Sequence, residues 1–330
     1  MGVTCLIVCH AGRQIGLGHL TRSLVAAAAL DEALDADVSL LVQGEFVERL
    51  DLAATRHRFV TAEENLVEAV MHSVQEVGPS VVVFDLSPRH EPAGIARLLD
   101  GLRREGRKLV SVDGLTDQRS RLDLLFIPSF RCVLPPALPG EAPVVFGWDC
   151  FLLGGEQVPV QWKPGNRVLA LTGGSDTTGL GATLPELLDR GIDKRSEVHW
   201  VVGPYAPEPI GPATSARRMV LHHSPAGLTS LMSKSNYGIT VFGVSFFELL
   251  RLGVPTVVFS PYGSKDADEL SALASEGVAL VADNEVDAVD KLRVVMGDDE
   301  LAAQLSRRAA LKMSGSGGQR LAEAVAALVG

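Results

Sequence analysis

Short apolar runs alternate with longer Ala/Leu-rich or amphipathic stretches along most of this chain. The clearest buried strand covers 81–84 and ends at Asp85, and the run 109–112 ends at Asp113. Alternating strands and helices are typical of a parallel sheet covered by helices on both faces. The other elements expected in the first half are strands at 4–9, 38–42, 59–60 and 122–127, helices at 23–34, 63–77 and 93–105, and an apolar run at 46–53.

A proline-rich passage at 128–143 interrupts this alternation, because so many prolines cannot continue a helix or a central strand. The segment 144–163 is expected to cross between two domains. The alternation then restarts, with expected strands at 168–171, 198–202, 219–222, 238–241 and 256–259 and a last helix at 319–328. We therefore predict an α/β protein with two similar Rossmann-like lobes that face each other across a cleft, an N-terminal domain at 1–150 and a C-terminal domain at 151–330.

Composition narrows the classes of ligand. The 330 residues are 46% hydrophobic, which is ample for two cores. The formal net charge is -10, and both halves hold more acidic than basic residues, so no basic surface is available for nucleic acid. A phosphorylated ligand must be held by helix N-termini and single side chains.

The cysteines favour a reduced, cytoplasmic protein. All four are scattered, and Cys5 and Cys9 alternate along the first strand as small buried residues do, so we predict neither disulfides nor a metal site, and no cofactor. The N-terminus lacks the pattern of a signal peptide, and no run of about 18 apolar residues indicates membrane insertion. The oligomeric state stays open.

A glycine-containing turn joins the first strand to the first helix. Gly16 and Gly18 let the backbone approach a ligand, and the first amides of the helix can face an anion. His19 lies at the positive end of the helix dipole, which favours a neutral, basic imidazole, and Arg22 falls on the same helical face. Such turns also occur in α/β proteins without a site there, and Asp85 could equally be a cap or turn residue.

The second half carries two further glycine turns after expected strands. The first covers 173–176, reads Gly-Gly-Ser-Asp and is expected to enter a helix directly. The second covers 243–245 and enters a helix that carries Glu248 and ends at Gly253, before Pro255. Both turns are candidates for contact with phosphate groups.

These three turns together resemble one family, the UDP-sugar hydrolases of pseudaminic acid biosynthesis (UDP-trideoxy-diacetamido-altropyranose hydrolase) and a related spore-coat polysaccharide protein. The family turn Gly-x-Gly-His-x-x-Arg has the spacing of Gly16, Gly18, His19 and Arg22. The resemblance extends to Ser-Gly-Gly-Gln-Arg at 316–320. The family is similar to the peptidoglycan N-acetylglucosaminyltransferase, so the resemblance implies a glycosyltransferase B (GT-B) architecture.

The resemblance implies that His19 is the base that activates water against the anomeric carbon while UDP leaves. The glycine turns of the second domain would approach the diphosphate, and Glu248 would accept hydrogen bonds from the ribose hydroxyls. His19 and this diphosphate site are expected to confront each other across the cleft. The full expected substrate-binding set is Gly16, Gly18, Arg22, Asp85, Gly173, Gly174, Ser175, Asp176, Gly243, Val244, Ser245, Glu248, Lys265 and Asp266.

Several ligand-facing positions depart from the family pattern. Cys9-His10 stands where the family commonly has Arg-Asp, and Asp113-Gly114 stands where it has Asp-Asp. The Asn-Gln that would contact phosphate or sugar aligns with Lys265-Asp266. Such changes alter which sugar hydroxyls or phosphate oxygens can be satisfied, so the sugar stays undetermined.

Three functions follow from these observations. The first hypothesis is a hydrolase that releases UDP from a UDP-activated amino or deoxy sugar, on the way to a pseudaminic acid type nonulosonic acid or a surface glycan. The alternative is a UDP-sugar-dependent glycosyltransferase, in which His19 deprotonates an acceptor hydroxyl, so that turnover depends on an acceptor. The third is a non-catalytic homologue that binds a nucleotide sugar without turnover.

Overall fold

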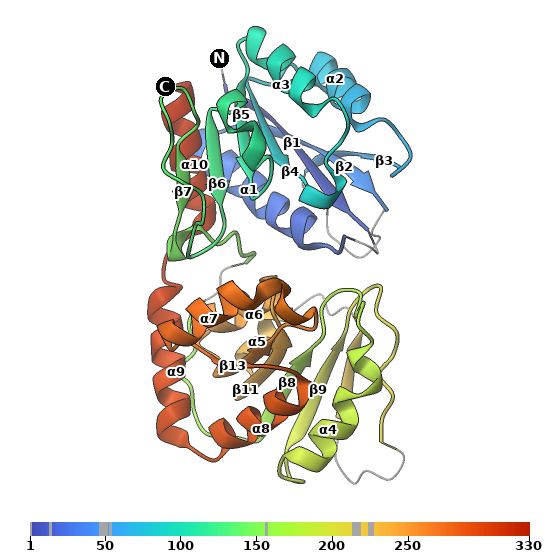
Figure 1. Ribbon diagram of the computed structural model, residues 1–330, viewed down its shortest axis with the longest axis vertical. Coiled ribbons are helices and arrows are strands. Elements are labelled where there is room, and N and C mark those ends of the chain that lie inside the picture. Colours follow the sequence, from blue (N-terminus) through green and yellow to red (C-terminus); the bar gives the residue numbers. More distant parts are fainter. Residues whose placement is uncertain are drawn as a thin grey trace. The chain divides into compact units, whose positions relative to one another are not determined.

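The computed structural model describes residues 2–12, 15–45, 52, 55–155, 158–212, 219–223 and 228–330 (Figure 1). The chain forms two compact units. Unit 1 comprises Met1–Gly154 together with Gly315–Gly330, and unit 2 comprises Gly155–Ser314. Of the apolar run expected at 46–53, all but Leu52 lies outside the described residues.

The described residues of unit 1 form a parallel sheet in the order β3-β2-β1-β4-β5-β6-β7. The order reverses between β1 and β4, so the carboxyl ends of these two strands mark the position where doubly wound sheets bind ligands. The strands are β1 (Thr4–Ala11), β2 (Asp37–Gly44), β3 (Arg56–Val60), β4 (Val81–Asp85), β5 (Lys108–Val112), β6 (Leu124–Ile127) and β7 (Val144–Phe146).

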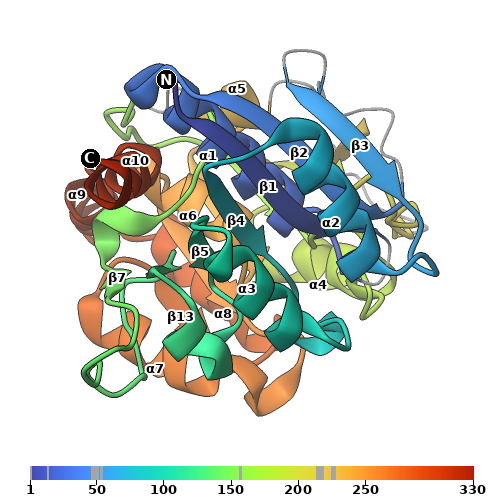
Figure 2. The same cartoon turned by 90° about the horizontal axis from the view of Figure 1, so that it is seen from above.

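Helices cover both faces of this sheet, because consecutive β1 side chains are apolar and point to opposite faces. Cys5 and Ile7 pack with α1 (Gly18–Leu34) and α10 (Gly317–Val329). Leu6 and Val8 pack with α2 (Leu66–Val77) and α3 (Ile95–Arg104), which lie side by side in Figure 2. Short 3₁₀ turns occur at η1 (Pro88–His90), η2 (Thr116–Arg121) and η3 (Trp148–Cys150).

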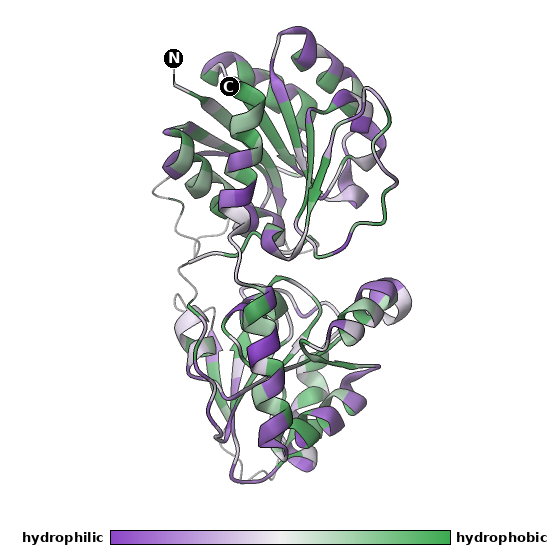
Figure 3. Cartoon of the chain, turned by 90° about the vertical axis from the view of Figure 1, so that its left-hand side faces the viewer, coloured by the Kyte–Doolittle hydropathy of each residue, from purple (hydrophilic) through white to green (hydrophobic). Residues whose placement is uncertain are grey.

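Unit 2 repeats this plan with a parallel sheet in the order β10-β9-β8-β11-β12-β13, which reverses between β8 and β11. One face packs against α4 (Leu184–Gly191), α8 (Glu285–Met296) and α9 (Asp299–Lys312), and the other against α5 (Leu228–Ser233) and α6 (Val244–Arg251). Figure 3 shows the hydrophobic strands between helices that are hydrophilic on their outer sides. The remaining elements are β8 (Arg167–Leu171), β9 (Glu197–Val202), β10 (Met219–His223), β11 (Tyr237–Val241), β12 (Thr256–Phe259), β13 (Leu280–Ala282), α7 (Ala267–Glu276), η4 (Leu180–Ala182) and η5 (Gly263–Asp266).

Two segments differ from the expectation drawn from the sequence. Residues 144–146, which we expected in a crossing between domains, form β7 and pair in parallel with β6. Residues 315–330, which the expected boundary placed in the C-terminal domain, belong to unit 1, because Leu321, Ala322 and Val325 of α10 are buried in its core.

Two helices begin at other residues than expected. Helix α1 begins at Gly18 and not near Ser23, so His19 and Arg22 lie in its first turns. Helix α4 begins only at Leu184, so the turn at 173–176 leads into a loop and not directly into a helix. Within the described parts of the chain, no helix is long and apolar enough to cross a membrane.

Candidate active site

The imidazole of His19 and the carboxylate of Asp85 meet where the strand order of unit 1 reverses. His19 lies in the first turn of α1, and Asp85 is the last residue of β4. Their Nδ1 and Oδ1 atoms are 2.6 Å apart. Gly16, just before the helix, has a φ of 84°, a conformation that favours glycine. Helix α1, which starts at Gly18, has no side-chain cap, so its first amides stay available to a ligand.

The contact with Asp85 determines which ring nitrogen of His19 carries the proton. Burial by itself would raise the pKa of the Asp85 carboxyl, but the charge of Arg22 and the hydrogen bonds from His19 and Arg22 outweigh it and lower the pKa. An ionised carboxylate only accepts hydrogen bonds, so Nδ1 of His19 must donate. In the neutral ring Nε2 then has a free lone pair. This is the arrangement of a general base oriented by a carboxylate.

Arg22 binds the same carboxylate from the other side. Its Nε donates to Asp85 Oδ2 and its Nη2 to Asp85 Oδ1, both at 2.6 Å. Its Nη1 donates to Asp113 Oδ2 at 2.9 Å. Arg22 and Asp85 were expected to contact the substrate, but in the structure they bind each other, and their side chains are only 12% and 1% exposed. Asp113 was not in the expected set, and its position at the end of the strand next to β4 was the available signal.

His10, noted in the sequence only as a departure from the family pattern, is buried at the carboxyl end of β1. Its Nδ1 accepts a hydrogen bond from the backbone N–H of Ser87 at 3.0 Å. Burial lowers the pKa of His10 to about 4, with smaller contributions from His19 and His90. Through its hydrogen bond with Ser87, the neutral ring therefore holds the turn that comes immediately after Asp85.

We expect His10 to make unit 1 less stable in mild acid. The unfolded chain binds a proton on this ring near pH 6.5, whereas the folded chain binds it only near pH 4. The stabilisation is therefore complete above about pH 6.5 and is lost as the pH falls toward 4, by about 3 kcal/mol at most. Urea unfolding of His10→Asn, compared with wild type at pH 7.5 and pH 5, should show a smaller loss in the variant.

The exposed His57, for which Asn is also a close substitute, provides the matched control. His57→Asn should keep the wild-type loss of stability between these two pH values. Contributions of His199 and His222, whose pKa values burial also lowers, are common to all three proteins and cancel in the comparison. An unchanged pH dependence in His10→Asn would contradict the assignment.

In unit 2, the turn after β8 packs tightly against the loop after β9. Gly173 has a φ of 89°, which favours glycine, and the Gly174 carbonyl accepts a hydrogen bond from the Tyr205 N–H at 2.9 Å. Asp176 directs its carboxylate into the loop itself, where Oδ1 and Oδ2 accept the N–H groups of the next segment at 3.0 and 2.8 Å. Both of its oxygens are therefore engaged by backbone. The neighbouring Ser175 is half-buried.

The turn after β11 leads directly into α6. Gly243 is exposed and extended, and a Cβ there would meet nothing within 4 Å, so the local packing does not require glycine. Val244 and Ser245 begin the helix, which has no side-chain cap. Burial raises the pKa of Glu248, one turn later, and a hydrogen bond from Ser245 partly offsets this. The result is an open helix start beside a half-buried carboxylate.

A third loop, after β12, carries Lys265 and Asp266. Asp266 Oδ2 accepts the Ser260 hydroxyl at 2.5 Å, and the Lys265 Nζ lies 4.9 Å from the centre of the Tyr262 ring. The Tyr262 hydroxyl hydrogen-bonds Thr177 at 2.8 Å. Because β11 lies between β8 and β12, this bond joins the loops on either side of the start of α6. Sequence reasoning had no signal for Thr177 or Tyr262.

The expected residues thus gather at the carboxyl ends of β1 and β4 in unit 1 and of β8, β11 and β12 in unit 2. Among the residues that the structure describes, no three His, Cys, Asp or Glu side chains are grouped to hold a metal ion. The arrangement offers unit 1 a general base and unit 2 an uncapped helix start with a nearby lysine.

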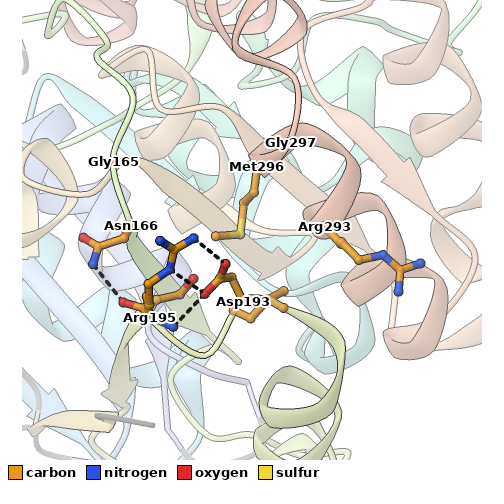
Figure 4. A pocket seen from close by; sticks show the side chains of 9 residues that line it. Gly165, Asn166, Asp193, Arg195, Arg293, Met296 and Gly297 are labelled. Atoms are coloured by element: carbon orange, nitrogen blue, oxygen red, sulfur yellow. Dashed lines mark hydrogen bonds and ion pairs between the residues drawn. The ribbon is translucent and has the colours of Figure 1, made fainter.

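A pocket of about 510 Å³ lies at the opposite edge of the unit 2 sheet (Figure 4). It is lined by Asn166 and Ser196, which precede β8 and β9, and Met296 points into it. Arg195 at its rim pairs with Asp193 at 3.0 Å, and the Arg195 side chain is 89% exposed. Since ligands of parallel sheets bind at the carboxyl ends of strands, this pocket is not the candidate site.

No family model matches the chain, and no curated protein matches its sequence. Solved structures match the fold over nearly all of it. The spinosyn forosaminyltransferase SpnP matches with a TM-score of 0.69 and 15% identity, covering 100% of both chains. The spinosyn rhamnosyltransferase SpnG, complexed with thymidine diphosphate, matches with a TM-score of 0.66 and 16% identity, covering 99% of this chain and 100% of that one.

Phytolacca americana UGT2, complexed with UDP-2fluoro-glucose and pterostilbene, matches with a TM-score of 0.66 and 13% identity, covering 98% of this chain and 99% of that one. At such identities the likeness concerns the fold alone. Units 1 and 2 are two Rossmann-like α/β domains with parallel sheets, and the fold is that of the GT-B glycosyltransferases. The expected fold class, two Rossmann-like α/β lobes of the GT-B type, is thereby confirmed.

Proposed function

We propose that this protein transfers a glycosyl group from a nucleotide diphosphate sugar to an acceptor hydroxyl, with His19 as the general base. The observation that carries the proposal is the 2.6 Å contact between His19 Nδ1 and Asp85 Oδ1. It leaves Nε2 as a proton acceptor at the position where α/β sheets bind ligands. Of the solved structures named above, two are sugar transferases by name, and the third is complexed with UDP-2fluoro-glucose.

We assign the nucleotide to unit 2. The first amides of α6, at Val244 and Ser245, have no side-chain cap and suit a diphosphate. Glu248, one turn later, suits the two hydroxyls of a ribose, since a carboxylate accepts two hydrogen bonds. Lys265 on the neighbouring loop supplies a positive charge of the kind that a diphosphate leaving group requires.

The reaction is a substitution at the anomeric carbon. The acceptor hydroxyl gives its proton to His19 Nε2 while its oxygen forms the new bond to the anomeric carbon. The bond from this carbon to the β-phosphate oxygen breaks, and the electron pair leaves with the nucleotide diphosphate. The imidazolium that forms is stabilised by Asp85, whose carboxylate already holds Nδ1–H.

Hydrolysis is the second candidate, in which water replaces the acceptor. It is favoured by the spacing of Gly16, Gly18, His19 and Arg22, which is that of the UDP-sugar hydrolases of pseudaminic acid biosynthesis. The same base would then activate water, and UDP would leave in the same way. Release of UDP from UDP-activated amino sugars, measured with and without acceptor alcohols, separates the two reactions.

The nucleotide-binding part can be tested before the sugar is known. We expect UDP to bind, and Glu248→Ala to weaken this binding about 10- to 100-fold, since one or two hydrogen bonds to a charged group are lost. Glu300→Ala, an exposed glutamate on α9, should leave the affinity unchanged. Titration calorimetry with UDP and with thymidine diphosphate measures both the affinity and the preferred base.

Equal UDP affinity in wild type and Glu248→Ala would contradict the assigned ribose contact. Absence of binding by both nucleotides would contradict the assignment of unit 2. Binding without turnover of any donor, with or without acceptors, would instead select a non-catalytic nucleotide-sugar-binding protein.

A further inference from the structure

We propose that Arg22 and Asp113 are positioning residues that set the base strength of His19 through Asp85, and that they do not contact the substrate. This inference rests on the proposed role of His19 as a base. It concerns a second carboxylate, from the loop after β5, that was not among the expected substrate-binding residues.

The first step is that the hydrogen-bonding capacity of Asp85 is fully used. Its two oxygens accept His19 Nδ1, Arg22 Nε and Arg22 Nη2 at 2.6 Å each, and the Ser23 hydroxyl approaches Oδ2 at 3.5 Å. A carboxylate has about four acceptor positions. With its side chain 1% exposed, Asp85 has no acceptor left for a ligand and acts only through His19 and Arg22.

The second step is that Arg22 opposes Asp85 in its effect on His19. The Arg22 Nη2 atom lies 3.0 Å from His19 Nδ1, and both donate to the same Asp85 oxygen. Asp85 stabilises the imidazolium, whereas a guanidinium at this distance destabilises it. The proton affinity of His19 therefore depends on whether another negative charge, besides Asp85, pairs with Arg22.

The third step is that Asp113 supplies this second negative charge. It accepts Arg22 Nη1 at 2.9 Å, and its side chain is 48% exposed. A loop of unusual conformation holds it there, since Asp113 has a φ of 63° and Leu115 a φ of 54°. The Gly114 between them is packed so closely that an added Cβ would lie 2.7 Å from the Leu86 carbonyl oxygen, next to Asp85. Strained backbone of this kind is common where a side chain must be placed.

The charged and titratable groups around His19 are few among the described residues. Arg22 comes from α1, Asp85 from β4 and Asp113 from the loop after β5. His10 and Cys9 of β1 also interact with this cluster, and with pKa values of about 4 and about 12 both stay neutral between pH 5 and pH 10. A change of charge at Asp113 or Arg22 should therefore be felt at His19 without competing changes nearby.

The two substitutions should move the imidazole titration of His19 in opposite directions. Asp113→Asn keeps the shape and the tolerance for positive φ but removes the second carboxylate that pairs with Arg22, so the pKa of His19 should fall by about half a unit to one unit. Arg22→Gln removes the cation and leaves Asp85 with His19 as its charge partner, so the pKa of His19 should rise. A structural disturbance alone would not give opposite signs.

The measurement is an NMR titration of protein labelled with ¹³C at histidine Cε1, in which the His19 signal is assigned by its absence in His19→Gln. Asp100→Asn is the matched control, because Asp100 is an exposed carboxylate of unit 1 that also pairs with an arginine, at 3.0 Å. This control should leave the His19 titration unchanged. If Arg22→Gln does not fold, the sign and size of the Asp113→Asn shift still decide.

An unchanged His19 titration in Asp113→Asn, or a shift equal to that of Asp100→Asn, would overturn the proposal. The experiment needs no substrate, so its failure is distinct from failure of the proposed function. Once a donor is known, the acid limb of kcat/KM in Asp113→Asn should shift to lower pH by the same amount. If the titration shifts as expected but turnover does not require His19, the effect of Asp113 and Arg22 on His19 is supported and the role of His19 as general base is refuted.

Discussion

Alanine in place of His19 should lower kcat/KM for glycosyl transfer about a thousandfold while nucleotide binding persists. The loss follows because His19, which Asp85 orients, is the group assigned to take the proton from the acceptor hydroxyl. UDP affinity should stay within a factor of about two, because the nucleotide is assigned to unit 2 and His19 lies in unit 1. Initial rates of UDP release with donor and acceptor, together with calorimetry, measure the two effects.

His72→Ala is the control for this experiment. His72 lies on α2 of the same unit, is exposed and pairs with Glu76 one turn later at 3.3 Å, so its removal should change neither rate nor affinity. Retention of wild-type turnover by His19→Ala would refute the base assignment. An equal loss of turnover in His19→Ala and His72→Ala would indicate that the substitutions disturb the fold of unit 1 and that His19 has no specific catalytic role.

Aspartate in place of Leu321 should unfold unit 1 and spare unit 2. Leu321 of α10 is 0% exposed and packs in the core that α1 and β1 share. A charge there has no partner, and the cost of about 4 kcal/mol or more is a large part of the stability of a domain. Hydrogen exchange should show lost protection in β1 and β4 and retained protection in β8 and β11.

The start of α10 lies close to α1 and to the segment after η3. A Cβ at Gly318 would lie 2.9 Å from that of Ala29, and one at Gly317 would lie 2.3 Å from the Phe151 carbonyl oxygen. Ala327→Asp, on the exposed side of the same helix, is the control and should keep both units protected. Unfolding of both units by Leu321→Asp, or of neither, would contradict the division of the chain.

The sequence alone predicted much of what is local. The alternation of strands and helices, the turn that places His19 at a helix start, and the glycine turn that enters α6 all arise within a few residues. Hydrophobic periodicity and glycine placement act over this same range. The resemblance identified the GT-B architecture as well, because its motifs are made of such turns.

Side-chain hydrogen bonds, both local and long-range, were harder to predict from the sequence. The helix expected right after Asp176 begins only at Leu184, because the Asp176 carboxylate captures the next amides and holds a loop. Arg22 was expected to face a ligand, since nothing in its local sequence indicates that Asp85 and Asp113, 63 and 91 residues away, take up its donors.

The amino-acid sequence by itself determined two α/β units and a histidine at the first strand-to-helix turn, because short-range patterns of apolar residues and glycines specify such elements. Only the tertiary structure decided that β4 pairs with β1, that Asp85 binds His19 and Arg22 while Asp113 binds Arg22, and that the last helix returns to unit 1. Strand order in a parallel sheet depends on how the crossover helices pack, and that packing is settled by burial over the whole unit.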